Sequence, residues 1–176
     1  MKALLIGLVA AAIFVVGGLR IFGRKLSRLL EVRARKVTDI EGISITLRMN
    51  GEPSLFILLA ADGTINRMGS GTLDDANREL FNGTGQQQVF EATRSKVAPG
   101  ILKLCGHFEQ SDEFPYELIV QFKFNDGSDS GFGLRYDSDS ELPETVRQFV
   151  ADAMRVTDQW CRDFKDRAQR HPHAQG

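Results

Sequence analysis

The chain has few of the residues from which metal and catalytic sites are usually built. Its 176 residues include two cysteines, three histidines and one tryptophan. A structural zinc site needs four closely spaced ligands, whereas here only Cys105 and His107 lie near each other, on either side of a glycine. The sequence therefore predicts no metal, no cofactor and no catalytic residue, and it favours a protein that is not an enzyme. It assigns no role to Cys105, His107 or Cys161.

The chain also lacks a net positive charge and an internal repeat. Its formal net charge is -1, but the charges are unevenly distributed. Residues 1–36 contain eight basic residues and one acidic residue, so the remainder carries 14 basic and 22 acidic residues. An acidic body excludes nucleic acid as a partner, because binding to phosphates requires clustered positive charge. A basic amino-terminal segment is instead attracted to an anionic lipid surface.

One long hydrophobic run is present, and it predicts a transmembrane anchor over residues 1–22. Residues 3–19 contain no polar side chain, and as a helix they span about 26 Å, close to the hydrocarbon thickness of a bilayer. The residues expected in the membrane include Ala3, Gly7, Ala11, Phe14 and Leu19. The first three recur every four residues, a spacing of small side chains that lets two membrane helices associate.

A basic juxtamembrane segment, residues 23–37, follows this run. We expect Arg20, Arg24, Lys25 and Arg28 to contact lipid headgroups. Seven Lys or Arg residues lie within the 17 residues after Leu19, and only Lys2 precedes the run. Because such charges stay on the cytoplasmic side, the sequence predicts a cytoplasmic body. The alternative is a signal peptide cleaved near Gly18, which would export the body.

The body, residues 38–168, begins with strand patterns. Apolar residues alternate with polar ones over residues 43–49, and Asn50-Gly51 then predicts a hairpin. The segment SLFILLA predicts a buried strand, and Asp62-Gly63 turns the chain into a third strand, TINRMGS. Further along, Thr72 and Asp75 resemble a capping box, which predicts a short helix that includes Phe81 and ends at Asn82-Gly83.

The second half of the body is predicted with differing clarity. Residues 89–97 are compatible with a strand, and apolar residues between 101 and 108 have helical spacing around Gly106. Apolar residues alternate clearly from Tyr116 to Phe124 and again from Phe132 to Tyr136. A long apolar stripe of helical period predicts a helix over about residues 143–167, and residues 169–176 are predicted to be a disordered tail. The predicted fold class is α+β, with an antiparallel sheet packed by helices on one face.

Four carboxylates around the second hairpin form a candidate cation or ligand cluster: Asp126, Asp129, Asp137 and Asp139. Oxygen-rich loops of this kind can hold calcium. The helix–loop–helix calcium motif is absent, however, because the sixth and twelfth positions counted from Asp137 are Leu142 and Gln148. Turn formation explains the same residues equally well.

These patterns predict a membrane-anchored module for protein interaction or assembly, with an apolar patch on the sheet face that no helix covers. The alternative is an exported hydrolase or small-ligand-binding domain with a cleaved signal peptide. It requires a pocket that gathers at least two of His107, Asp112, Glu113 and Arg135. A third hypothesis is a spacer with a purely structural role.

Overall fold

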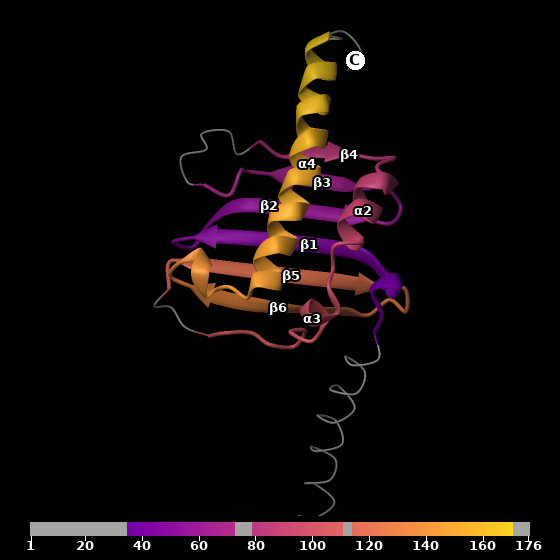
Figure 1. Ribbon diagram of the computed structural model, residues 1–176. Helices are drawn as coiled ribbons and strands as arrows, with labels where there is room; N and C mark the ends of the chain where they lie inside the picture. Colours follow the sequence, from indigo (N-terminus) through magenta and orange to yellow (C-terminus); the bar gives the residue numbers. More distant parts are fainter. Residues whose placement is uncertain (1–34, 73–78, 111–113, 171–176) are drawn as a thin grey trace, which may run out of the picture. The chain divides into compact units, whose positions relative to one another are not determined.

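The described part of the chain folds into one antiparallel sheet with helices packed against one of its faces (Figure 1). The computed structural model describes residues 35–72, 79–110 and 114–170. The strands are β1 (Ile40–Met49), β2 (Glu52–Ala60), β3 (Ile65–Met68), β4 (Phe81–Gly83), β5 (Tyr116–Phe124) and β6 (Asp129–Tyr136). The helices are α2 (Gln87–Arg94), α3 (Pro99–Leu102) and α4 (Glu144–Arg170), with short 3₁₀ helices at Val37–Asp39 and Asp139–Glu141.

The six strands lie in the order β4-β3-β2-β1-β5-β6, so β1 and β2 are central. Their hairpin is closed by Asn50 and Gly51, with φ angles of 52° and 80°. Both values lie in the left-handed region that a two-residue hairpin turn requires, and Asn and Gly adopt it most readily. The hairpin predicted from Asn50-Gly51 is therefore confirmed.

Two further hairpins share one local structure. In the β2–β3 hairpin the amide of Ala60 donates to the carbonyl of Thr64 (2.9 Å), and the amide of Thr64 donates to the Asp62 carboxylate (2.8 Å). In the β5–β6 hairpin, Asp126 accepts from the amide of Ser128 in the same way (2.9 Å). Because β1 pairs with both β2 and β5, the two turns flank the start of β1 at one end of the sheet.

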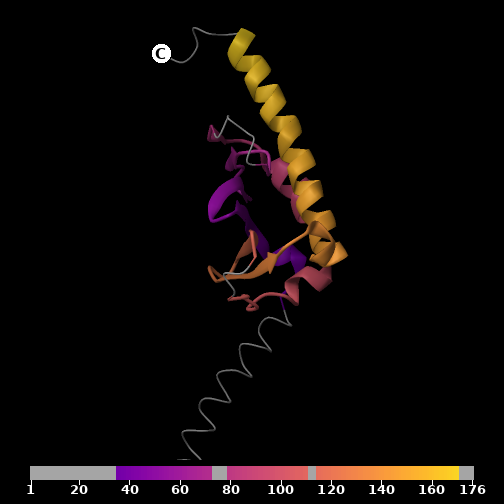
Figure 2. The same cartoon turned by 90° about the vertical axis from the view of Figure 1, so that its left-hand side faces the viewer.

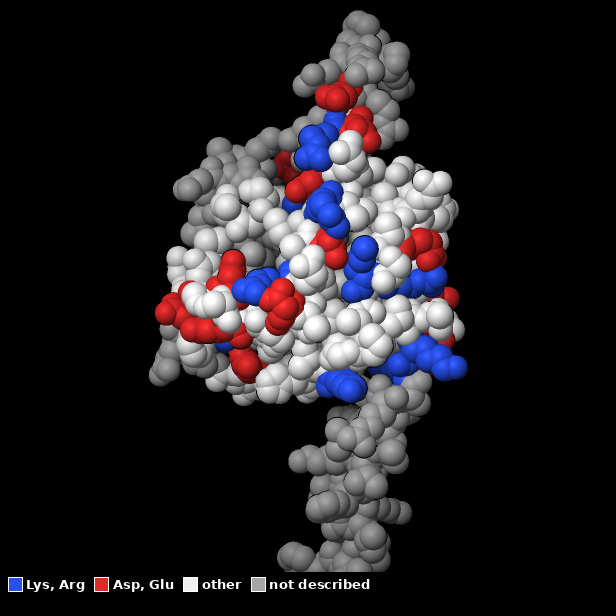
Figure 3. Space-filling view, in the orientation of Figure 1, with Lys and Arg blue, Asp and Glu red and all other residues white. Residues whose placement is uncertain are grey.

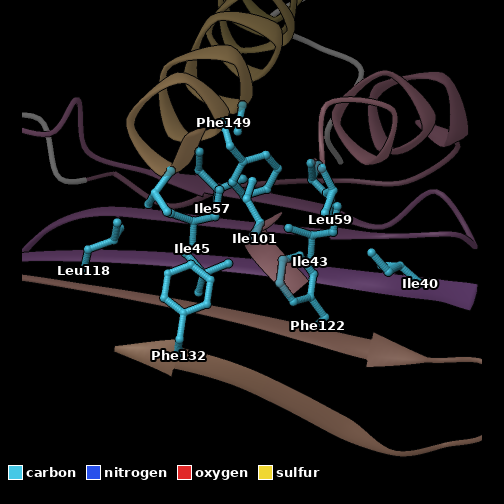
Figure 4. Close-up of a cluster of buried hydrophobic side chains, with 14 of the residues drawn as sticks. Ile40, Ile43, Ile45, Ile57, Leu59, Ile101, Leu118, Phe122, Phe132 and Phe149 are labelled. Carbon is cyan, nitrogen blue, oxygen red and sulfur yellow. The ribbon is translucent and has the colours of Figure 1, made fainter. Parts of the chain in front are cut away.

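The helices cover one face, which we call the inner face (Figure 2). Strand alternation places apolar side chains on it, and Figure 4 shows Ile43, Ile45, Ile57 and Phe122 meeting Phe149 of α4. Each of these side chains is at most 1% exposed. Burial of a side chain of this size stabilises the fold by up to about 1.5–3 kcal/mol before the entropy cost. The predicted helical stripe thus closes the core.

The long helix α4 crosses the strands and extends beyond β4 (Figure 1). Its 27 residues span about 40 Å, whereas six strands spaced about 4.8 Å apart span about 24 Å. Near this far end Phe164 packs edge-on against Phe81 of β4, with ring centroids 6.0 Å apart. The predicted helix over residues 143–167 and the predicted α+β class are confirmed.

Three local predictions need correction. Phe81 and Asn82-Gly83 form strand β4 instead of ending a helix, because they pair with β3 at the sheet edge. The strand considered for residues 89–97 is wrong, since this segment begins as helix α2, which buries Phe90 and Thr93 against the core. Helical structure between residues 101 and 108 is limited to the end of α3, and the chain then turns at Gly106, whose φ is +88°.

Several predictions concern residues outside the described part of the chain. These are the anchor over residues 1–22, most of the basic segment 23–37, most of the helix predicted from Thr72, and most of the tail predicted for residues 169–176, whose first two residues instead end helix α4. Among the described residues, no helix combines the length and apolar character needed to cross a membrane.

Candidate functional site

The face of the sheet opposite the helices, here called the outer face, carries a row of five residues across the strands, three of which are large and apolar. Strand pairing sets Met68 beside Phe56, Phe56 beside Thr46, Thr46 beside Ile119, and Ile119 beside Gly133. We call these five residues the apolar row. It crosses five strands, which corresponds to about 19 Å. Phe56, Met68 and Ile119 are half-buried, although α2, α3 and α4 all lie on the other side (Figure 2).

Phe108 extends the apolar row beyond the last strand. It forms a parallel bridge with Gly133, and a Cβ placed on Gly133 would lie 2.9 Å from the Phe108 ring. Gly133 therefore leaves room for the ring, which is still 51% exposed. Large apolar side chains gathered on an uncovered sheet face are a common feature of interaction surfaces.

The apolar row lies between two polar rows. On one side Glu117 of β5 accepts from Arg48 (3.2 Å) and from Arg135 (3.0 Å), which places both signs of charge next to each other. On the other side Ser44 of β1 pairs with Gln121 of β5, next to a depression of about 630 Å³ over Gly42 whose lining also includes Leu58. The outer face thus combines an apolar centre with polar margins, as protein interfaces do.

A second candidate site lies on the inner face, between the start of α4 and the ends of β1, β5 and β6. This groove has a volume of about 640 Å³. We call it the tyrosine groove, because Tyr116 and Tyr136 line it as a stacked pair with ring centroids 5.2 Å apart and an interplanar angle of 17°. Its other described lining residues are Leu47, Met49, Ser70, Gly71, Thr72, Leu118, Asp137, Ser138, Asp139, Leu142, Arg147, Val150, Ala151 and Met154.

Tyr136 is the polar group best placed to act in this groove. It is 3% exposed, and no described residue forms a hydrogen bond with its hydroxyl. Burial and the nearby carboxylate of Asp139 raise the pKa of Tyr136 above its usual value, so the phenol stays neutral. Figure 3 shows acidic side chains gathered beside the start of α4.

A third groove, of about 720 Å³, lies between α2 and α4 and has Trp160 on its wall. Trp160 is only 5% exposed, and its ring lies 5.4 Å from that of Phe164. The indole also approaches Gly83 closely, since a Cβ added there would lie 2.5 Å from it. These contacts confirm that Trp160 belongs to the core.

The structure places the four predicted cluster aspartates in two pairs at opposite ends of β6. Asp126 lies in the β5–β6 turn and Asp129 is the first residue of β6, while Asp137 and Asp139 follow the end of the strand. β6 has eight residues and spans about 26 Å, so the four carboxylates do not form one cluster. Among the described residues, no group of three or more His, Cys, Asp or Glu side chains could hold a metal ion.

Of the residues proposed for a hydrolase site, the described ones, His107 and Arg135, lie at the β6 edge. His107 contacts Glu109 (3.4 Å), and Glu109 also accepts from the amide of Arg135 (2.7 Å). Neither His107 nor Arg135 lines the grooves described above, and Asp112 and Glu113 lie outside the described residues. Cys105 and Cys161 are half-buried and form no disulfide bond with each other.

One buried charge was not expected from the sequence. Arg67 of β3 points into the core with a side chain 3% exposed and forms an ion pair with Asp158 of α4 (2.9 Å). Its Nε donates to Thr157 (3.2 Å), and its Nη1 donates to the carbonyls of Met68 (2.8 Å) and Gly69. A satisfied guanidinium of this kind fixes α4 on the sheet.

The predicted lipid-contacting residues, Ala3 to Arg28, lie outside the described part of the chain. Comparison with known proteins finds no matching family model, no matching curated protein and no matching solved structure.

Proposed function

We propose that this protein is a single-pass, membrane-anchored module for protein interaction or assembly, and that the outer face of its sheet binds a second copy of the chain. The observation that carries the proposal is the apolar row, which presents Phe56, Ile119 and Met68 on a face that no described helix covers. Association through this row would bury these side chains, at about 25 cal/mol for each Å² of apolar surface removed from water.

Two features favour a second copy as the occupant. The charged row beside the apolar row contains Arg48, Glu117 and Arg135, so a copy of the same face offers both signs of charge for pairing. An anchor would also confine copies to one membrane, where the spacing of Ala3, Gly7 and Ala11 promotes helix association. Confinement raises the effective concentration of the second contact.

The interface is tested with a single outer-face substitution and a matched control. Two differently tagged full-length copies are expressed together, and their co-purification from solubilised membranes is measured. Ile119→Glu places a charge in the apolar row and is expected to lower co-purification at least ten-fold. Gln121→Glu introduces the same charge two residues along the same face and is expected to leave it unchanged. If Ile119→Glu copies pair as well as the unchanged chain, the outer face is not the interface.

The membrane anchor is tested separately. We expect the full-length chain to resist alkaline extraction, and a reporter that is active only in the cytoplasm to be active at the carboxyl end. The basis is the seven Lys or Arg residues, against one Glu, in residues 20–36 immediately after the apolar run. Release of a chain with a new amino terminus near residue 19 would instead support the alternative of an exported domain.

That alternative, an exported hydrolase or small-ligand-binding domain, remains a second proposal. One observation favours its ligand-binding form, namely the tyrosine groove, in which the hydroxyl of Tyr136 bonds to no described residue. The hydrolase form required a pocket that gathers at least two of His107, Asp112, Glu113 and Arg135; His107 and Arg135 line none of the grooves described above, so no observation favours this form.

A further inference from the structure

We infer that the tyrosine groove binds a small organic amine with an apolar body. The groove lies on the inner face of the sheet, opposite the apolar row, so the inference does not depend on the proposed function of the outer face. It would hold on either side of a membrane.

The size and the walls of the groove suit a small molecule. Its volume is about 640 Å³, within the range of about 300–1,000 Å³ that ligand sites typically have. Leu47, Met49 and Leu118 of the sheet face Met154 of α4 across it. Methionine side chains adapt to ligands of different shape, so the apolar body of the ligand would rest between Met49 and Met154.

The hydroxyl of Tyr136 supplies a polar contact in the groove lining. No described residue bonds to this hydroxyl, and its oxygen is not among the described buried polar atoms that lack a partner, so it is open to solvent and can bond to a ligand although the residue as a whole is 3% exposed. Stacking on Tyr116 holds the ring in place. A neutral phenol oxygen accepts a hydrogen bond as readily as it donates one, so an ammonium N–H of a ligand can bond to it.

The charges around the groove select for a cation. Asp137 and Asp139 line it, and the amide of Asp137 donates to Glu141 (2.9 Å), which holds this loop against the helix start. Arg147 is the single basic residue among the described lining residues, and its guanidinium is paired with Glu144. The groove therefore has an excess of negative charge at its mouth, which attracts amines and repels carboxylates.

The methionines provide a direct test. The chain has four, Met1, Met49, Met68 and Met154, of which Met49 and Met154 line the groove and Met68 lies on the outer face. The full chain, with ¹³C-labelled methionine methyl groups and held in lipid nanodiscs, is titrated with 2-phenylethylamine, 2-phenylethanol and phenylacetate. We expect the amine to shift the signals of Met49 and Met154 in a saturable manner and to leave that of Met68 in place.

The variants separate the polar contacts from packing. Tyr136→Phe keeps the ring stack and is expected to weaken amine binding about five-fold, the usual effect of one lost hydrogen bond. Asp139→Asn is expected to weaken it several-fold, whereas Asp129→Asn at the opposite end of β6 should not. The inference is overturned if neither Met49 nor Met154 shifts at millimolar amine, if phenylacetate binds as tightly as the amine, or if Tyr136→Phe leaves the affinity unchanged.

Discussion

Removing the carboxylate of the Arg67–Asp158 pair should destabilise the fold more than removing the guanidinium. Arg67 is 3% exposed at its side chain, whereas Asp158 is 44% exposed. Asp158→Asn therefore leaves a buried cation with neutral acceptors only, while Arg67→Met leaves a carboxylate that water can reach. Breaking a buried pair by removing one partner costs about 3–5 kcal/mol. Because Asp158 is partly solvated, we expect about 2–3 kcal/mol for Asp158→Asn, as for a charged hydrogen bond.

Arg67→Met should cost less, about 1 kcal/mol, because an unbranched apolar side chain fills a similar space. Thr157, which accepts from Arg67, keeps its own bonds to the carbonyls of Ala153 (2.8 Å) and Met154 (3.1 Å). Asp158→Asn, which changes the smaller side chain, is thus expected to destabilise the fold more than Arg67→Met, which removes the larger one.

The assay is urea unfolding followed by the fluorescence of Trp160, the single tryptophan of the chain. It is buried where α4 packs on Gly83, so its emission reports separation of α4 from the sheet. Asp163→Asn, an exposed substitution on the same helix, is the control and should stay within about 0.5 kcal/mol of the unchanged chain. The reasoning fails if Arg67→Met lowers the free energy of unfolding more than Asp158→Asn does, while the dependence of that free energy on urea concentration is the same in both variants.

Three further outcomes follow from the same structure. Gly83→Ala should lower the free energy of unfolding by about 1–3 kcal/mol and alter the tryptophan emission, because the new Cβ would lie 2.5 Å from the indole. Gly100→Ala should be neutral in the same urea assay, because no atom lies within 4 Å of the new Cβ. Gly51→Ala should lower the free energy of unfolding by about 1 kcal/mol, since its φ is 80° even though the space around it is open; an unchanged urea midpoint would contradict this. The hydrogen bond from the amide of Thr64 keeps the pKa of Asp62 below its usual value of 3.8. The bond therefore stabilises the fold above pH 3.8, and this stabilisation is lost as the pH falls through the lowered pKa. In Asp62→Asn the urea midpoint should therefore fall less steeply below pH 4 than in the unchanged chain. An equally steep fall in both would argue against the bond.

The parts of the fold that were predictable are those with long, regular patterns. The alternation around Ile43 and from Tyr116 to Phe124 identified strands, because each has one face in the core. The stripe that contains Phe149 and Trp160 identified α4 for the corresponding reason. Asn50 and Gly51 indicated a turn, because both residues tolerate the positive φ angles that the turn requires.

Short elements and distant contacts gave no such signal. β4 has three residues, too few for a period to show, and its position depends on pairing with β3. Arg67 and Asp158 are 91 residues apart, so no local pattern relates them. Tyr116 and Tyr136 were predicted on apolar strand faces, but their stacking depends on the register of β5 and β6, which sets them opposite each other.

The central claim, that the outer face meets a second copy at the membrane, is tested most directly by site-specific photo-crosslinking in intact membranes. A photoreactive residue is placed at position 119 in the apolar row or, as the control, at position 155, where Arg155 on α4 is 72% exposed. We predict that position 119 gives an adduct with twice the mass of the chain and that position 155 does not. Equal yields at the two positions, or no protein adduct at position 119, would contradict the claim.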